Sequence, residues 1–201
     1  MKTTLYLIRH AESDHAVRDA KTRPLTEKGL RDAKKLPQFF KTVPVTRIFS
    51  SPYLRASQTV LPLSKDKNLP VITDERAREW MGGRPFPQEI FESRMREMFE
   101  DEKATNGGAE SLKALKKRTM ALLMHLLTRY PGETIVIGTH ALALTAAIMN
   151  FDSSIGLEFL MNLLPVTPYI AEMIFEDFAL VSMRFINPCY EETAFSREDK
   201  I

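Results

Sequence analysis

The sequence predicts an α/β protein, a three-layer α/β/α sandwich with a mostly parallel central sheet and a C-terminal antiparallel hairpin. Short apolar runs of β-favouring residues alternate with helical patterns over residues 3–149, which is typical of a parallel sheet. Two more apolar runs, at residues 169–175 and 178–186, flank a Glu-Asp turn and indicate the hairpin. A chain of 201 residues can cover such a sheet on both faces, so we expect a single domain over residues 1–201.

The first strand is expected at residues 3–8, an apolar run about as long as one buried strand. Polar residues 14–24 show no regular period and indicate a surface loop beside the strand end. Thr26 can then cap a helix, which Pro37 should kink or stop. The chain thus begins with a strand, a long loop and a helix.

A second strand and helix follow at once. Residues 45–49 form a short strand pattern. Ser50 and Ser51 are candidate N-caps of the next helix, with Pro52 at its first position. Arg55 would therefore lie in the first helical turn, beside free backbone N–H groups.

The middle of the chain combines an edge strand with a charged helical segment. Residues 69–73 read as a third strand, and Pro70 suits an edge position. Residues 87–103 have apolar side chains at helical spacing among many charges, followed by a turn rich in small residues. We expect residues 84–108 to form a helical lid insertion within the domain.

The last βα unit has the clearest patterns. Ser111 caps a long helix with a continuous leucine stripe, which Pro131 and Gly132 end. Residues 134–138 form another buried strand, and residues 141–149 an apolar helix.

Composition excludes several classes of protein. No apolar run approaches the roughly 20 residues of a membrane span, and the start has too short an apolar stretch for a signal peptide, so we expect a cytoplasmic protein. A net charge of +2 offers no electrostatic basis for nucleic acid or an acidic membrane as partner. The single cysteine, Cys189, cannot form an internal disulfide.

Cations and imidazoles follow the strands at the points where those strands end. Arg9 and His10 come directly after the first strand, His140 follows the strand at residues 134–138, and Arg55 begins a helix. The carboxyl ends of neighbouring parallel strands share one edge, so these side chains can converge there. Arginine binds phosphate oxygens bidentately, whereas the flanking cations and the spacing of the histidines disfavour a metal site. The set therefore predicts a phosphoryl site without metal or cofactor.

At this point the chain resembles the histidine phosphatase superfamily, the phosphoglycerate mutase-like family. The resemblance extends in order over about residues 3–150, and its motifs together are far more specific than any one alone. These motifs are LIRHAES at 7–13, SSPYLRASQT at 50–59, REWMGG at 78–83, GAES at 108–111 and IGTH at 137–140.

The resemblance implies a role for each matching residue. His10 would be the nucleophile that carries the phosphohistidine, Arg9 and Arg55 would hold the phosphoryl oxygens, and His140 would complete the pocket. Glu79 would be the proton donor to the leaving group. These roles suit phosphoryl transfer, in which a preset clamp of donors supplies most of the catalysis and no metal is obligatory.

The chain departs from the family pattern near the expected phosphate. Ala11 stands where glycine is usual, and we expect its methyl group to be tolerated. Ala16 stands where the family commonly has an asparagine that touches phosphate, and Ser13 or His15 could take its place. Residues 23–29 (RPLTEKG) are similar to short bacterial phosphohistidine phosphatases, which lack the acid glutamate region and the lid.

The leading hypothesis is a metal-independent phosphatase that hydrolyses phosphomonoesters through a phosphohistidine intermediate on His10. Its partner would be a small phosphorylated substrate or a phosphoprotein. Two alternatives stay open: phosphoglycerate mutase-type transfer, which the absence of the mutases' Trp-Asn pair weighs against, and a non-catalytic module that recognises phosphate.

Overall fold

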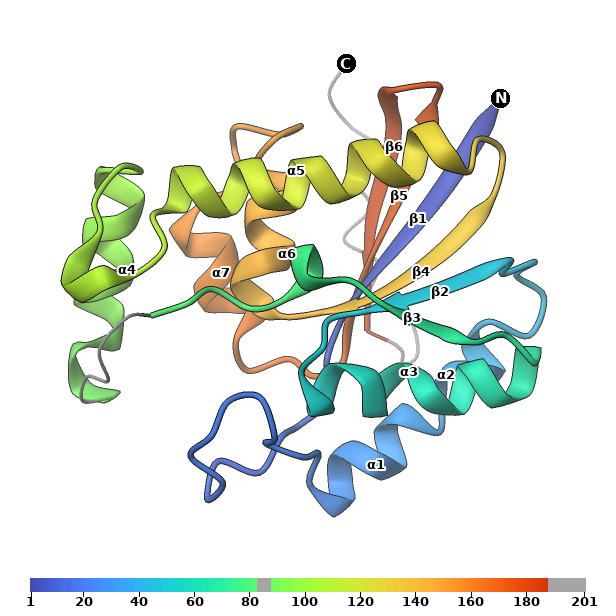
Figure 1. Ribbon diagram of the computed structural model, residues 1–201, viewed down its shortest axis with the longest axis horizontal. Coiled ribbons are helices and arrows are strands. Elements are labelled where there is room, and N and C mark those ends of the chain that lie inside the picture. The colour runs from blue at the N-terminus through green and yellow to red at the C-terminus, as the bar shows by residue number, and fades with distance from the viewer. Residues whose placement is uncertain (83–87, 188–201) are drawn as a thin grey trace.

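The computed structural model describes residues 1–82 and 88–187, and its centre is a mixed sheet. Within these residues the sheet has six strands in the order β3-β2-β4-β1-β5-β6 (Figure 1). The pairs β2–β3, β2–β4 and β1–β4 are parallel, and β1–β5 and β5–β6 are antiparallel. The strand bounds are Lys2–Arg9 (β1), Arg47–Ser50 (β2), Val71–Thr73 (β3), Thr134–Thr139 (β4), Tyr169–Glu176 (β5) and Ala179–Ile186 (β6).

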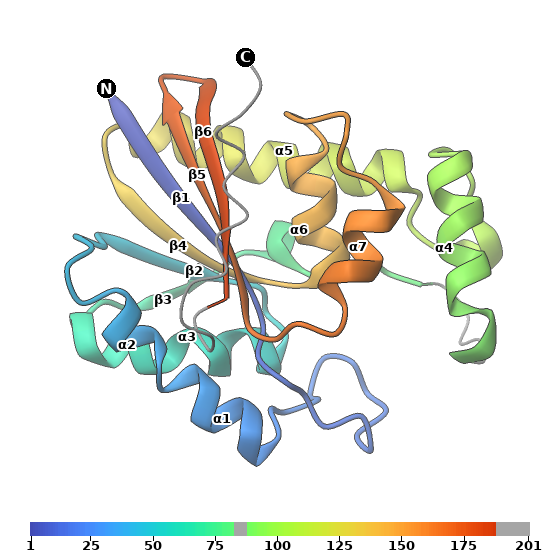
Figure 2. The ribbon, with the colours of Figure 1, turned by 180° about the vertical axis from the view of Figure 1, so that it is seen from behind.

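Helices cover both faces of this sheet, as the two opposite views show (Figures 1 and 2). Helices α1, α2 and α3 lie against one face, α5, α6 and α7 against the other, and α4 stands beyond α7 at one end. None of the helices in residues 1–82 and 88–187 has the length and apolar character of a membrane span. The helix bounds are Glu27–Ala33 (α1), Leu36–Phe39 (α2), Leu54–Lys67 (α3), Phe91–Glu100 (α4), Leu112–Arg129 (α5), Ala141–Ile148 (α6) and Leu157–Leu163 (α7).

The alternation of side chains along β1 explains the two cores. Leu5 and Leu7 join the cluster that contains the α5 leucines and α6, whereas Tyr6 and Ile8 join the cluster of α2 and α3. Successive strand residues point to opposite faces, so an entirely apolar strand needs a helical layer on each side. The three-layer architecture predicted from the sequence is confirmed, as is the C-terminal hairpin.

Two of the predicted helix caps are confirmed and one is wrong. The side chains of Thr26 and Ser111 each accept a hydrogen bond from a backbone N–H in the first turn of α1 and α5. At α3 the N-cap is Tyr53, and Pro52 lies outside the helix. The Ser51 hydroxyl accepts from the Tyr53 N–H at 3.2 Å instead, which holds a turn between β2 and α3.

The second half differs from the sequence prediction in two places. Helix α4 covers residues 91–100 after a 3-10 turn at residues 88–90, and is therefore shorter than the predicted 87–103. Helix α7 was not anticipated, because seven residues are too short for a helical period to stand out. Cys189 and residues 83–87 of the expected lid lie outside the described residues.

Candidate active site

The candidate site lies at the carboxyl ends of three adjacent parallel strands, β1, β4 and β2. The His10 N–H donates to the Thr139 carbonyl at 3.0 Å, and the Ser51 N–H donates to the Gly138 carbonyl at 2.8 Å. These bonds continue the parallel ladders past the strand ends. His10, Ser51 and His140 are thereby brought side by side, at the edge where open α/β sheets bind ligands.

The ring of His10 is held in one tautomer by its two hydrogen-bond partners. Nδ1 lies 2.7 Å from the Ala11 carbonyl oxygen, which can only accept, and Nε2 lies 3.0 Å from the Nε–H of Arg55, which can only donate. The proton therefore sits on Nδ1, and Nε2 presents a lone pair. Burial, reinforced by the charge of Arg55, keeps the pKa of His10 well below its ordinary value, so the imidazole is neutral at pH 7.

His140 lies directly behind His10 and is fully buried. The two ring centroids are 5.3 Å apart, and Nε2 of His140 is 2.7 Å from the hydroxyl of Ser51. Among the described residues Nδ1 of His140 has no hydrogen-bond partner. Burial and the charge of Arg55 lower the pKa of His140 as well, so it too is neutral.

The guanidinium of Arg9 is held by the end of α7. Its Nη1 donates to the carbonyls of Leu163, Leu164 and Val166, at 2.9 Å for Leu164 and 2.8 Å for Val166. The Nε of Arg9 is buried and has no partner among the described residues. Burial lowers the pKa of Arg9 to about 10, which leaves the group charged at neutral pH. These helix-end carbonyls offset the desolvation of a positive charge.

Arg55 occupies the first turn of α3, as predicted. Its Nη1 donates to the Ala20 carbonyl at 2.6 Å while its Nε faces His10, so it connects the β1–α1 loop to the histidine. With Arg9, it places a second guanidinium beside His10.

Glu79 reaches the site from the segment that follows β3. Among the described residues, its Oε1 accepts from the Trp80 N–H at 2.9 Å and from the Ala143 N–H, in the first turn of α6, at 3.2 Å. Both bonds go to Oε1, which leaves Oε2 as the oxygen able to carry a proton.

The Glu79 segment is fastened from behind by Arg118 on α5. The Nη1 of Arg118 donates to the carbonyls of Arg76 at 2.8 Å and Arg78 at 3.0 Å. Its Nε and Nη2 form a bidentate pair with Glu110 at 2.8 and 2.7 Å. Arg118 was not singled out in the sequence, because a lone arginine on a long helix carries no local signal.

A cavity of about 240 Å³ opens in front of His10. Its lining residues come from the end of β1 and the β1–α1 loop, from α3, from the segment after β3, and from α4, α6 and α7 with the residue that follows it. Five predicted residues line it, whereas His140 lies behind it. The lining residues are Arg9, His10, Ser13, His15, Arg23, Arg55, Glu79, Trp80, Phe91, Ala141, Leu142, Leu160 and Leu164.

Both departures from the family pattern lie away from this cavity. Ala11 is fully buried in a small cluster with Leu25 and Ala33. Ala16 is exposed, and its N–H donates to the Asp14 side chain at 2.9 Å. The methyl group of Ala11 is therefore accommodated by the packing under the loop and does not line the cavity.

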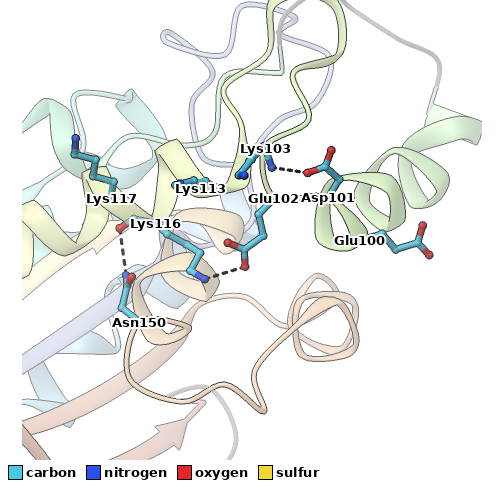
Figure 3. A pocket seen from close by; sticks show the side chains of 8 residues that line it. All are labelled: Glu100, Asp101, Glu102, Lys103, Lys113, Lys116, Lys117 and Asn150. Atoms are coloured by element: carbon cyan, nitrogen blue, oxygen red, sulfur yellow. Dashed lines mark hydrogen bonds and ion pairs between the residues drawn. The ribbon is translucent and has the colours of Figure 1, made fainter.

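A second hollow, of about 570 Å³, lies between the end of α4 and the start of α5 (Figure 3). Positively charged lysines and negatively charged carboxylates line it, and several of these side chains already form hydrogen bonds or ion pairs with one another. Lys116 pairs with Glu102 at 2.8 Å, and Asn150 donates to the Lys116 carbonyl at 3.2 Å. No predicted site residue lies there. Its charges largely offset one another.

Within the part of the chain that the structure describes, no three His, Cys, Asp or Glu side chains gather closely enough to hold a metal ion.

Two proteins of known family are similar to this chain in sequence. Phosphoserine phosphatase 1 of Hydrogenobacter thermophilus is 30% identical over 166 residues, which cover 75% of this chain and 78% of that protein. A probable phosphoglycerate mutase of Cronobacter sakazakii is 27% identical over 157 residues, 70% of each chain.

The fold is also found in solved structures. A mutant phosphoserine phosphatase of Entamoeba histolytica, in complex with phosphoserine, has a TM-score of 0.72 at 22% identity, over 90% of this chain and 96% of that one. The family model of the histidine phosphatase superfamily (branch 1) matches residues 5–170. The chain therefore belongs to the histidine phosphatase superfamily.

Proposed function

We propose that this protein is a metal-independent phosphatase that hydrolyses phosphomonoesters through a phosphohistidine on His10. The observation that carries the proposal is the unprotonated Nε2 of His10, a residue that lines a cavity of about 240 Å³ together with three arginines. A neutral imidazole is a competent nucleophile toward phosphorus, and the arginines supply the charge that a phosphoryl group needs.

In the first step the Arg55 Nε–H leaves the Nε2 lone pair of His10 and turns to a phosphoryl oxygen. The freed lone pair forms a bond to phosphorus, and the bond from phosphorus to the leaving oxygen breaks. The proton on Nδ1 stays in its hydrogen bond to the Ala11 carbonyl, which stabilises the imidazolium that forms. The leaving alkoxide takes a proton from Glu79. In the second step water attacks the phosphohistidine and gives its proton to the Glu79 carboxylate, so both groups return to their starting states.

In this scheme the arginines supply the positive charge that stabilises the transition state, so no metal ion is needed. Phosphoryl transfer passes through a loose, highly charged transition state, in which fixed positive groups supply most of the stabilisation. Arg9 is set in place by the α7 carbonyls before substrate arrives, and Arg55 already points its Nε at the attacking nitrogen. His140, hydrogen-bonded to Ser51 and with its ring centroid 5.3 Å from that of His10, is proposed to complete the pocket from behind His10.

The relatives support a small phosphorylated substrate. One is named as a phosphoserine phosphatase and another as a probable phosphoglycerate mutase, and the substrates in both names are small phosphomonoesters. A cytoplasmic location, a lid at residues 84–108 and a phosphate contact by Ser13 remain parts of this proposal.

The test is phosphate release from 4-nitrophenyl phosphate and phosphoserine, with and without a chelator. We expect chelator to leave the activity intact and His10→Ala to abolish it. The matched control is His125→Ala, because His125 is an exposed histidine on α5 and should leave the rate unchanged. An acid-labile phosphoryl label should appear on the wild-type protein and be missing from His10→Ala. Full activity in His10→Ala, or activity only with added metal, would overturn the proposal.

The same preparations separate hydrolysis from phosphoryl transfer between hydroxyl groups. Isomerisation of phosphoglycerate with little phosphate release would establish a mutase. Tight binding of phosphoesters without turnover would establish a recognition module.

A further inference from the structure

Thr59 is a threonine of α3 that lies outside the set of residues lining the cavity. It follows Arg55 by one helical turn and is fully buried. Its Oγ1 donates to the Arg55 carbonyl at 2.7 Å, a bond that threonines often form within their own helix. A second bond sets Thr59 apart, because the same oxygen accepts from the Ala11 N–H at 3.0 Å.

Each of these two hydrogen bonds can run in only one direction. The Ala11 N–H can only donate and the Arg55 carbonyl can only accept, so the Thr59 hydroxyl accepts from the first and donates to the second. Thr59 therefore joins the backbone of the residue after His10 to the backbone of Arg55. Ala11 and Thr59 are 48 residues apart in the sequence, so only the folded chain makes this connection.

The two residues that Thr59 joins are also the ones that hold the imidazole of His10. Nδ1 of His10 donates to the Ala11 carbonyl at 2.7 Å, and Nε2 accepts from Nε of Arg55 at 3.0 Å. With the two bonds of Thr59, these form a closed circuit of four buried hydrogen bonds through His10, Ala11, Thr59 and Arg55. Both nitrogens of the nucleophile are thus placed by residues that Thr59 connects.

The Ala11 end of this circuit stays on the imidazole during attack. When the Arg55 Nε–H turns to the phosphoryl group, the Nδ1–H of His10 keeps its bond to the Ala11 carbonyl. That bond becomes stronger as positive charge develops on the ring, since hydrogen bonds from charged donors are the stronger ones. The side chain of Ala11 is a single methyl group packed against Leu25 and Ala33, which gives the carbonyl no direction. The hydrogen bond to Thr59 gives the main chain a directional anchor at this residue.

We propose that Thr59 is a positioning residue for the nucleophile, whose hydroxyl fixes the Ala11 main chain so that its carbonyl stays on Nδ1 of His10 while Nε2 attacks. Thr59 acts through Ala11 and Arg55 and does not touch the substrate. This inference rests on the proposed phosphatase function and adds a residue to its machinery. Its effect falls on the transition state, where the ring is charged, and not on the binding of phosphate.

The experiment removes the Thr59 hydroxyl in steps. Thr59→Val keeps the branched shape without the hydroxyl, Thr59→Cys offers a weaker donor and acceptor, and Thr59→Ser keeps the hydroxyl. With 4-nitrophenyl phosphate, we expect kcat/KM to fall about tenfold in Thr59→Val, as for the loss of one buried hydrogen bond, and to stay within about threefold in Thr59→Ser. Thr59→Cys should lie between them. The inhibition constant of inorganic phosphate should stay within about threefold throughout, because the groups that bind phosphate are unchanged.

A spectroscopic measurement follows the Nδ1–H bond itself. The Nδ1 proton of His10, assigned by its loss in His10→Ala, should give a downfield NMR signal in the wild type and in Thr59→Ser. In Thr59→Val the signal should move upfield or broaden through exchange with water, because the Ala11 carbonyl is no longer held.

The matched control is Thr119→Val. Thr119 is a buried threonine of α5 whose hydroxyl bonds carbonyls of its own helix at 3.0 and 3.1 Å. It lies on the buried stripe of α5 with Leu115 and Leu122. At a temperature where all variants are folded, Thr119→Val should change neither the Nδ1 signal nor kcat/KM.

Four results would each overturn the inference: an unchanged kcat/KM in Thr59→Val, an unshifted Nδ1 signal in that variant, an equal loss in Thr59→Ser, or an equal loss in Thr119→Val. If Thr59→Val does not fold, Thr59→Cys and Thr59→Ser supply the comparison, and equal activity in these two overturns the inference as well. The NMR measurement needs no turnover. A wild-type protein without phosphatase activity would therefore refute the proposed function, while the Nδ1 signal would still report on Thr59.

Discussion

Arg118 fixes the segment that carries Glu79, so replacing Arg118 is expected to lower both the stability and the activity of the protein. Arg118 does not line the cavity, yet its Nη1 binds the two carbonyls at Arg76 and Arg78 that precede Glu79. The perturbation is Arg118→Met, which keeps most of the side-chain length and removes the four hydrogen bonds of the guanidinium.

The expected loss of stability comes from the buried Glu110 carboxylate, which loses the guanidinium of Arg118. The Glu110 side chain is only 8% exposed, and in the variant its nearest cation is Arg78, at 3.7 Å. Burial raises the pKa of Glu110, and it is the hydrogen bonds from Arg118 that bring it below its ordinary value. Leaving one partner of a buried pair with no counter-ion costs about 3–5 kcal/mol. Because Glu110 keeps the longer contact to Arg78, we expect the free energy of unfolding in denaturant to drop by less, about 2–3 kcal/mol.

A second substitution checks the cause of this loss. Arg118→Met combined with Glu110→Leu removes both partners and should recover part of the stability, because the buried carboxylate is gone. The recovery is incomplete because Arg78 loses its ion pair with Glu110. A double variant as unstable as the sum of the single variants would contradict the ion-pair explanation.

The catalytic consequence is measured with leaving groups that differ in their need for a proton. An alkyl phosphate depends on the Glu79 proton, whereas 4-nitrophenyl phosphate has a leaving group that departs without one. At a temperature where the variant is folded, Arg118→Met should lower kcat for the alkyl ester at least about tenfold more than for the aryl ester, since general acid catalysis is worth about 10²–10⁴-fold. Equal losses on both esters would refute the argument that Arg118 positions the acid.

Three further predictions concern the surroundings of the site. Burial keeps His10 and His140 neutral, so below pH 6.5 the unfolded chain binds up to about two more protons than the folded chain. The free energy of unfolding in denaturant should therefore fall by up to about 2.7 kcal/mol per pH unit as the pH drops from 6.5 toward the folded pKa values. A flat profile between pH 7.5 and 5.5 would contradict this. Gly29→Ala should destabilise the fold by about 1–3 kcal/mol despite the better helix propensity of alanine, because its Cβ would lie 2.1 Å from the Glu12 backbone oxygen; an increase in Tm would show that the backbone relaxes. Ser51→Ala should lower the unfolding free energy by about 1–3 kcal/mol by leaving Nε2 of His140 unpaired, and no change in the denaturation midpoint would mean that another donor or acceptor replaces the hydroxyl.

Local patterns of apolar residues in the sequence predicted most of the helices and strands. The apolar run of β1 and the leucine stripe of α5 identify their elements without any knowledge of neighbours, because a strand and a helix repeat with different periods. Helix α7 has seven residues and no such period, so its place was found only in the folded chain. The cap of α3 was missed for a related reason, since Ser51 is engaged by the Tyr53 N–H and by His140, which lies 89 residues away.

The chemical groups that meet at the site follow from the order of residues along the chain. Arg9 ends β1, and His10 and His140 directly follow strands. Because parallel strands end at one edge, their convergence is dictated by chain order and by the direction of the strands. The resemblance over about residues 3–150 then assigned the expected reaction to them.

The protonation and the orientation of these groups depend on contacts between distant parts of the fold. The proton of His10 is placed by the Ala11 carbonyl and by Arg55, 45 residues away, and the Arg9 guanidinium is held by carbonyls 154 to 157 residues away. These contacts depend on β4 inserting between β1 and β2, a strand order that no local period encodes. The protonation state of a nucleophile and the direction of a cation are set by such distant neighbours, since only packing excludes water and fixes donors against acceptors.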